Sequence, residues 1–169
     1  RGMRSGTLNV PGIVGFGKAC AICKQELESE GERLSRLRDK LEMALLGLTE
    51  TCINGNKGNR LPHISNMSFK YLEGSSLMSG ISGQIAVSSG SACTSALPEP
   101  SHVLKALGLD DELAHSSLRF GLGRFTTGEQ IDYAIEQVQK TVSSLRGTSV
   151  SWKRYQAGHA PKYNQIVKI

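Results

Sequence analysis

The sequence predicts an α/β fold in which a small sheet is covered by helices. Apolar residues alternate with polar residues over 66–71 and again over 118–122, which is the period of a strand with one buried face. Over 34–48 and 131–145, leucine, isoleucine and valine instead recur every three or four residues, as they do on one face of a helix. A chain of 169 residues is long enough to bury one ordinary core around these elements.

The longest predicted element is a helix near the N-terminus. Asn9 and Pro11 mark its start, because asparagine caps a helix and proline is tolerated in the first turn, where its missing N–H has no partner to lose. Its apolar stripe consists of Leu34, Leu37, Leu41, Leu45 and Leu48. The acidic and basic residues between 26 and 40 are most simply its solvated faces.

Shorter elements are predicted in the middle of the chain. Residues 52–54 read as a short strand before the turn-rich loop 54–59, and 74–81 read as a short helix. The apolar run 85–87 is predicted to be a strand, and 101–107 is predicted to be another short helix after two prolines.

The last strand and the last helix have the clearest patterns. On the strand 118–122, Arg119 faces away from the apolar side and lies beside glycine, so it is either an exposed edge-strand arginine or a ligand-binding one. Thr127 and Gln130 form a capping box for the last helix. After Gly147 the periodic pattern ends, which predicts a basic tail.

Charge and composition exclude several classes of protein. Hydrophobic residues at 38% and charged residues at 21% are typical of a globular piece, and no apolar run approaches the roughly 20 residues of a membrane span. The net charge is +5, but residues 148–169 hold four of the 20 basic residues and no acid, which leaves 16 basic against 15 acidic residues elsewhere. A nearly neutral body with 5% aromatic residues does not indicate a nucleic-acid partner.

Cysteine usage points to neither a disulfide framework nor a zinc site. The chain has four cysteines, and Cys20 and Cys23 form a CxxC within a helical segment without a second CxxC or a histidine pair at zinc spacing. They are most simply two small residues on one helix face. No signal or transit segment is visible, and a start at Arg1 suggests a processed or cut chain.

Cys93 has unusual neighbours. Among the eight other residues of the stretch 87–95, five are serine or threonine and one is glycine, a composition that predicts an exposed, mobile loop after a strand. Structural cysteines are usually buried among apolar residues, so the pattern argues against a structural cysteine. From the pattern alone, a free thiol on an unimportant loop is the simpler interpretation and a reactive thiol is the alternative.

Three stretches resemble a known family. The strings AVSSGSACTS, EPSHVLKALGLDDELAHSSLRFGLGRFTT and RGMRSGT closely resemble the C-terminal part of the NifS/IscS-type cysteine desulfurases, and the likeness runs from Arg1 to about Trp152. The resemblance implies the C-terminal small domain of the aspartate-aminotransferase-like architecture, PLP fold type I. A typical member has a longer N-terminal portion that is absent here.

The resemblance also implies roles for individual residues. Cys93 would take sulfur from L-cysteine as a persulfide and leave L-alanine, and it could be a transient iron–sulfur ligand. Arg119 would fork onto the substrate carboxylate, a task that lysine does poorly. Thr7 would hydrogen-bond the cofactor phosphate of the neighbouring subunit. His102 and His115 could activate the thiol, although surface or capping histidines are the simpler interpretation.

The implied cofactor is pyridoxal 5′-phosphate (PLP). No lysine here stands in the Ser-x-His-Lys setting that the family uses for the Schiff base, so the chain alone is not expected to bind PLP covalently. The implied partners are the N-terminal segment of the same enzyme, a second identical subunit, an iron–sulfur scaffold protein and, in a eukaryote, a small accessory subunit.

The implied division of the chain has four parts. Residues 1–10 form a cofactor-phosphate and dimer-contact loop, 11–48 a long connecting helix, 49–147 the small domain with the cysteine loop 88–100, and 148–169 a basic tail that departs from the usual ending. The compartment would be the cytoplasm in a bacterium and the mitochondrial matrix in a eukaryote.

Three functions remain open from the sequence. The first is an active desulfurase completed by an N-terminal segment that carries the PLP lysine. The second is a non-catalytic fragment that acts as a binding or sulfur-relay module without PLP. The third is another reaction on the same fold, such as that of an aminotransferase or a selenocysteine lyase.

Overall fold

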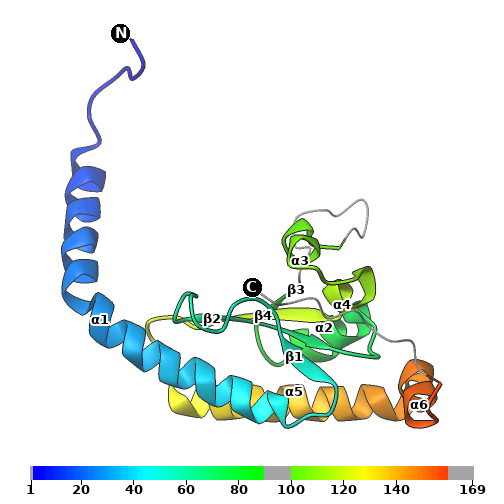
Figure 1. Cartoon of the computed structure of the whole chain (residues 1–169). Coiled ribbons are helices and arrows are strands. Elements are labelled where there is room, and N and C mark those ends of the chain that lie inside the picture. Colours follow the sequence, from blue (N-terminus) through cyan, green and yellow to red (C-terminus); the bar gives the residue numbers. More distant parts are fainter. Residues whose placement is uncertain (1, 90–99, 160–169) are drawn as a thin grey trace.

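The computed structural model describes residues 2–89 and 100–159 and has the predicted α/β architecture. Its elements are α1 (Val10–Leu46), β1 (Thr51–Ile53), β2 (Ile64–Phe69), α2 (Gly74–Ser82), β3 (Ser88–Ser89), α3 (His102–Ala106), α4 (Asp111–His115), β4 (Ser117–Gly121), α5 (Gly128–Thr148) and α6 (Val150–Gln156). The four strands form one antiparallel sheet in the order β1-β2-β4-β3. Figure 1 shows α5 and the second half of α1 along one face of this sheet, with α3 and α4 on the other side.

The hydrophobic core lies between the sheet and α1, α2 and α5. Leu41 and Leu45 of α1, Met67 and Phe69 of β2, and Val138 of α5 are at most 1% exposed. Each such side chain stabilises the fold by about 1.5–3 kcal/mol relative to an exposed one. The predicted apolar stripes therefore face this core, and the capping box at the start of α5 is present.

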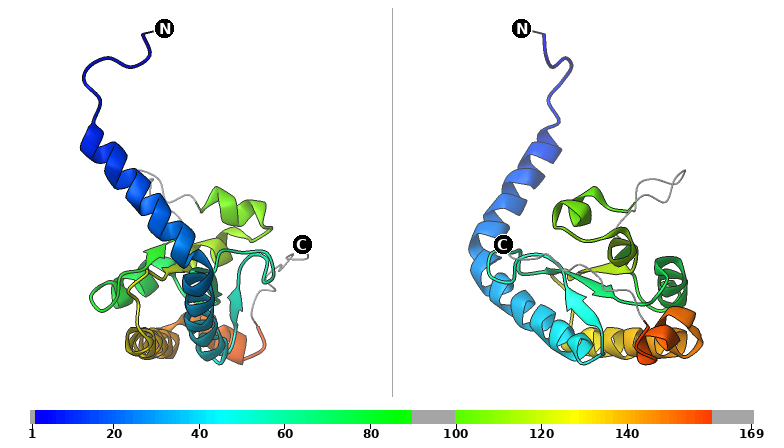
Figure 2. Two further views of the ribbon diagram at one scale, coloured as in Figure 1. Left: turned by 90° about the vertical axis from the view of Figure 1, so that its left-hand side faces the viewer. Right: turned by 45° about the vertical axis from the view of Figure 1, so that its right-hand side comes forward.

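The first half of α1 behaves differently from the second half. Asn9 accepts a hydrogen bond from Gly12 N at 3.1 Å and caps the helix as predicted. From Val10 to Ser29 nearly every residue is exposed, and Figures 1 and 2 show this half extending away from the body.

An ionic clasp ties α1 to the loop that follows β4. Arg33 Nη1 donates to Thr126 O at 2.7 Å, and Arg33 Nη2 donates to Arg124 O. In return, Arg124 pairs with Glu30 at 2.8 Å and Glu26 at 3.3 Å. The expectation that all charges between 26 and 40 are solvated is therefore wrong, and Arg38 is buried as well.

Both faces of β2 are covered near its end. The hydroxyl of Ser68 lies 2.7 Å from that of Ser117 on β4, and both donate to Leu113 O of α4. Asn54 Nδ2 donates to both serine hydroxyls as well. This satisfied polar layer lets α4 pack on the sheet without leaving a buried polar group unpaired.

Two predicted strand boundaries differ from the structure. The strand expected at 85–87 is found at Ser88–Ser89, because the N–H groups of Gln84 and Ile85 are bound to Ile81 O at the end of α2. Tyr71, expected within a strand, follows β2 with a φ of 64°.

Helices α4 and α6 were not predicted. Asp110 caps α4 by accepting from Leu113 N at 2.8 Å, a signal that is present in the sequence. Residues 150–156, expected to lie in a basic tail, instead form α6. It is capped by Ser149 and stacked on Tyr71, with 4.7 Å between the ring centroids of Tyr71 and Tyr155.

Candidate functional site

Arg119 projects from the middle of β4 on the face opposite the core. Its neighbours Leu118 and Phe120 are 1% and 4% exposed, whereas Arg119 itself is exposed. Strand β4 lies between β2 and β3, so the alternative of an edge-strand arginine is wrong. Within residues 2–89 and 100–159, the guanidinium has no hydrogen bond or ion pair. Among the described residues, all five N–H donors of this guanidinium are therefore unused.

The sheet register places two polar residues beside Arg119. Asn66 of β2 lies directly opposite Arg119 on one side, and Ser88 of β3 lies opposite it on the other. Residues that face each other across antiparallel strands project from the same side of a sheet. The sequence did not predict that Asn66, Arg119 and Ser88 lie side by side. The register between strands that are far apart in the chain cannot be deduced from either strand alone.

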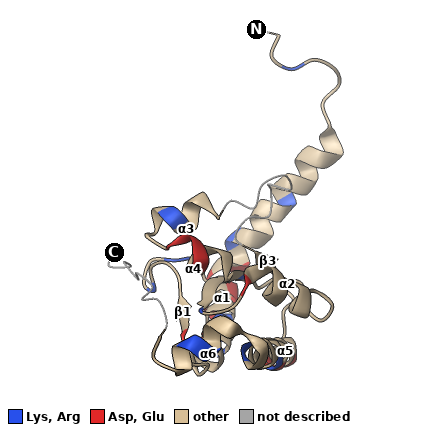
Figure 3. Ribbon diagram, turned by 90° about the vertical axis from the view of Figure 1, so that its right-hand side faces the viewer, with Lys and Arg blue, Asp and Glu red and all other residues tan. Residues whose placement is uncertain are grey.

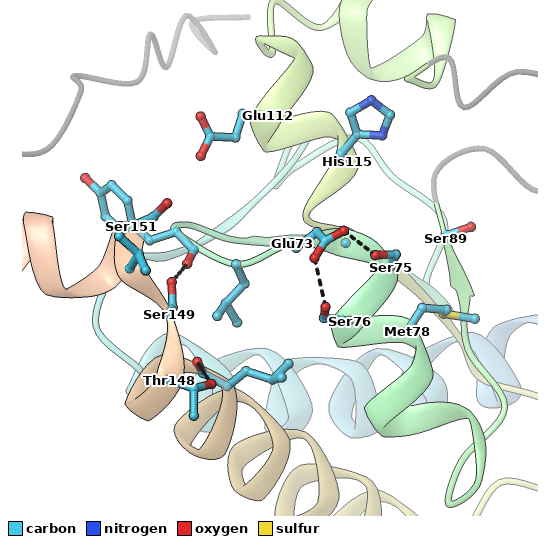
Figure 4. A pocket seen from close by; sticks show the side chains of 15 residues that line it. Glu73, Ser75, Ser76, Met78, Ser89, Glu112, His115, Thr148, Ser149 and Ser151 are labelled. Carbon is cyan, nitrogen blue, oxygen red and sulfur yellow. Dashed lines mark hydrogen bonds between the residues drawn. The ribbon is translucent and has the colours of Figure 1, made fainter.

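A pocket of about 880 Å³ opens beside the end of β3 (Figure 4). It lies between the start of α2, helix α4 and the junction of α5 with α6. Its polar lining residues are Glu73, Ser75, Ser76, Ser89, Glu112, His115, Thr148, Ser149 and Ser151. Ser89, the last residue of β3, therefore borders this pocket.

Glu73 is held as an anion at the entrance to α2. Its carboxylate accepts hydrogen bonds from Ser75 Oγ at 2.7 Å and Ser76 Oγ at 3.0 Å. These two hydroxyls lower the pKa of Glu73 below its ordinary value. Because the carboxylate is already bound and charged, it is poorly suited to accept a proton from a substrate.

The two candidate histidines differ in position. His115 is the last residue of α4, is exposed and lines the pocket of Figure 4 together with Ser89. His102 begins α3 and does not line that pocket. His115 also suits the negative end of the α4 dipole, so its position fits the capping interpretation equally well.

Thr7 lies far from Arg119. It precedes α1 at the end that projects from the body (Figure 2), and 37 helical residues span about 55 Å. Arg4 Nη1 donates to the backbone oxygens of Ser5, Gly6 and Thr7 at 2.7–3.0 Å. The Thr7 side chain is exposed, and no hydrogen bond to it occurs within the described ranges.

The cysteines carry no metal site in the described part of the chain. Cys20 and Cys23 are exposed on α1, and Cys52 is half-buried on β1. No group of three or more His, Cys, Asp or Glu side chains in residues 2–89 and 100–159 could hold a metal ion. Cys93, the predicted sulfur acceptor, and most of the predicted loop 88–100 lie outside the described residues.

Within those same ranges, none of the helices combines the length and the apolar composition that crossing a membrane requires.

Comparison with known proteins shows a consistent likeness. A model of the aminotransferase class-V family matches residues 1–134. Cysteine desulfurase IscS of Photorhabdus laumondii is 56% identical to this chain over 158 residues, and that of Pasteurella multocida is 57% identical over 158 residues. Both matches take in 94% of this chain but only 39% of the relative, so the chain spans about two fifths of the relatives' length.

Solved structures agree with the sequence matches. One NifS-like protein superposes with a TM-score of 0.72 and 34% identity, over 86% of this chain and 37% of its own. A NifS-like protein from Rickettsia africae superposes with a TM-score of 0.71 and 30% identity, over 83% of this chain and 36% of its own.

Proposed function

Because the chain belongs to the class-V aminotransferase family, we propose that it is the C-terminal part of a PLP-dependent L-cysteine desulfurase. Its fold is the small-domain part of PLP fold type I, as the sequence predicted and as the NifS-like structures share. The observation that carries the proposal is the pairing of Ser88 with Arg119. This pairing puts Arg119, which has no hydrogen bond or ion pair among the described residues, beside the strand that precedes Cys93 in the sequence.

In this proposal Arg119 binds the substrate and Cys93 accepts the sulfur. The guanidinium would hold the α-carboxylate of L-cysteine through two parallel hydrogen bonds. Cys93 follows Ser88 by five residues, and backbone length keeps their Cα atoms within about 18 Å. The Cys93 thiolate would attack the substrate sulfur, so that a persulfide forms on the protein and L-alanine is released. His115, which lines the same pocket as Ser89, is the histidine that we propose takes the thiol proton.

The cofactor would be held only in part by this chain. PLP supplies the electron sink that lets the carbon–sulfur bond of the substrate break. Thr7 fits a phosphate contact, since its hydroxyl is exposed and its segment is kept curled by the Arg4 hydrogen bonds. Because α1 carries Thr7 away from Arg119, this contact would be made to the PLP of the second subunit of a homodimer. The Schiff-base lysine would come from the N-terminal segment of the enzyme.

Further partners follow from the same proposal. The persulfide on Cys93 would be passed to an iron–sulfur scaffold protein or to another sulfur acceptor, and Cys93 could transiently bind the growing cluster. The relatives cited above come from bacteria. We therefore propose that the enzyme is bacterial and acts in the cytoplasm.

The test requires the chain together with the N-terminal segment of the enzyme. Cys93→Ser should abolish persulfide formation, measured by mass spectrometry after incubation with L-cysteine, while the absorption band of bound PLP remains. Arg119→Lys should raise KM for L-cysteine by about ten- to 150-fold, because a charged hydrogen bond worth about 1.5–3 kcal/mol is lost.

The matched control is Arg36→Lys. Arg36 is exposed on α1 and pairs with Glu32 at 3.9 Å rather than facing the sheet surface beside Ser88, so KM should stay within about twofold in this variant. A persulfide on the Cys93→Ser variant, or an unchanged KM in Arg119→Lys, would refute the assignment. A chain that never acquires the PLP band with its N-terminal segment would instead favour the relay module.

A further inference from the structure

A second pocket also borders the junction of α5 with α6, on the side where α1 ends. It has a volume of about 440 Å³. The lining residues are Gly47, Leu48, Thr49, Ser143, Arg146, Gly147, Trp152, Lys153 and Gln156. Two of these residues are cations and none is an acid. This pocket shares no lining residue with the pocket beside β3.

Arg146 is buried beside this pocket with few partners. The residue is 6% exposed, and its Nε is buried without an acceptor. Its one acceptor among the described residues is the backbone oxygen of Glu50, 3.4 Å from Nη2. A guanidinium has five N–H donors, so most of this group's capacity is unused.

The nearest carboxylate does not neutralise Arg146. Glu50 Oε2 is bound by Lys70 Nζ at 2.8 Å, and Oε1 accepts from Tyr155 OH at 3.0 Å. No described carboxylate forms a salt bridge with Arg146. Burial lowers the pKa of Arg146 from its ordinary value, against the opposing charge of Glu50. A buried cation in this state gains most from an anion that supplies both charge and acceptors.

The other lining groups suit a small anion as well. The guanidinium lies over the Trp152 ring, with Arg146 Cζ 4.2 Å from the ring centroid, which is a cation–π contact. Lys153 is exposed on α6, where Figure 3 shows basic residues, and Thr49, Ser143 and Gln156 add donors at the rim. The negative ends of α1 and α5 also stabilise Arg146, and they compete with any ligand for it.

We propose that this pocket is a binding site for a small oxyanion, a phosphate or carboxylate group, held by Arg146 and Lys153. The inference does not depend on the desulfurase assignment, since none of the residues involved belongs to the site around Arg119. The ligand would be either free in solution or an acidic group on a larger molecule, and both present the same chemistry to the guanidinium.

Trp152 provides the measurement, because it is the one tryptophan in the chain and lies against Arg146. The full 169-residue chain is titrated with inorganic phosphate, with sodium chloride added to hold the ionic strength constant. Saturable change in Trp152 fluorescence and a matching rise in Tm are expected. Sodium malonate forms the second arm: saturation by phosphate alone identifies a phosphoryl ligand, and saturation by both identifies oxyanions in general.

Variants separate the site from general surface charge. Arg146→Gln should abolish saturation. Because Arg146 is buried and its replacement also tests the fold, the exposed Lys153 is changed as well, and Lys153→Gln should weaken Kd for phosphate about two- to fivefold. Arg154→Gln, one residue further along the same helix and outside the pocket lining, should leave Kd unchanged. No saturable response in the unmodified chain, or equal weakening in Lys153→Gln and Arg154→Gln, would overturn the proposal.

Discussion

Glu42 is the side chain whose neutralisation should destabilise this fold most clearly. It is 4% exposed on α1 and accepts hydrogen bonds from Arg60 at 2.6 and 2.7 Å and from Ser65 Oγ at 2.6 Å. Glu42→Gln keeps the shape but leaves the mostly buried guanidinium of Arg60 without its main counterion. Breaking such a pair costs about 3–5 kcal/mol. In Glu42→Gln, the half-exposed Asp39, 3.6 Å from Arg60, still offsets part of the positive charge of Arg60. We therefore expect a loss at the lower end of this range, about 3 kcal/mol.

Urea denaturation followed by circular dichroism measures this loss directly. For a chain of this size, about 3 kcal/mol corresponds to a fall in Tm of about 6–12 °C. Arg36→Gln is the control, because its pair with Glu32 is 3.9 Å long and both side chains are more than half exposed. It should change the free energy of unfolding by less than about 0.5 kcal/mol. A loss of under about 1 kcal/mol in Glu42→Gln would refute the reasoning about burial.

Two other changes probe the packing of α4 and the charge of Glu50. In Gly74→Ala the added Cβ would lie 1.9 Å from His115 O, so α2 and α4 must separate. We expect a loss of about 3 kcal/mol in urea denaturation, and a loss under about 1 kcal/mol would show that the contact relaxes. The hydrogen bond from Lys70 chiefly holds the pKa of Glu50 below its ordinary 4.5. The stability that this carboxylate contributes is therefore present above pH 4.5 and lost as pH falls through the lower folded-state pKa. Glu50→Gln should be less stable than the unmodified chain at pH 7, and the difference should shrink below pH 4.5; a constant difference would contradict the assignment.

The sequence correctly predicted the features that depend on residues close together in the chain. The capping box of Thr127 and Gln130 and the alternation around Arg119 depend on residues within a few positions of each other, and the structure has both features. Helix α6 was missed because its support is distant in the chain. Trp152 and Tyr155 are stabilised by stacking on Tyr71, more than 80 residues earlier in the sequence.

The candidate site, too, could be predicted only in part from the sequence. The alternation pattern identifies the face on which Arg119 lies, but not the neighbours Asn66 and Ser88, because the register depends on the whole sheet. Arg146 looks like any basic residue near a helix end. Its burial arises only when α6 folds back over it, so no pattern in the sequence distinguishes it.

The clasp between α1 and the loop after β4 limits how far the N-terminal half of α1 can tilt relative to the body. The helix continues for about 20 residues beyond Glu30 towards its N-terminus, a lever of about 30 Å, so each degree of tilt moves its far end by about half an ångström. A hydrogen bond from Thr7 to a phosphate tolerates a displacement of only a few tenths of an ångström. In the proposed enzyme, the position of Thr7 relative to the phosphate would therefore depend on the contacts of Arg33 and Arg124, in the body that also carries Arg119. Loss of the contacts of Arg33 or Arg124 would let the N-terminal end of α1 move, although no residue near that end had been changed.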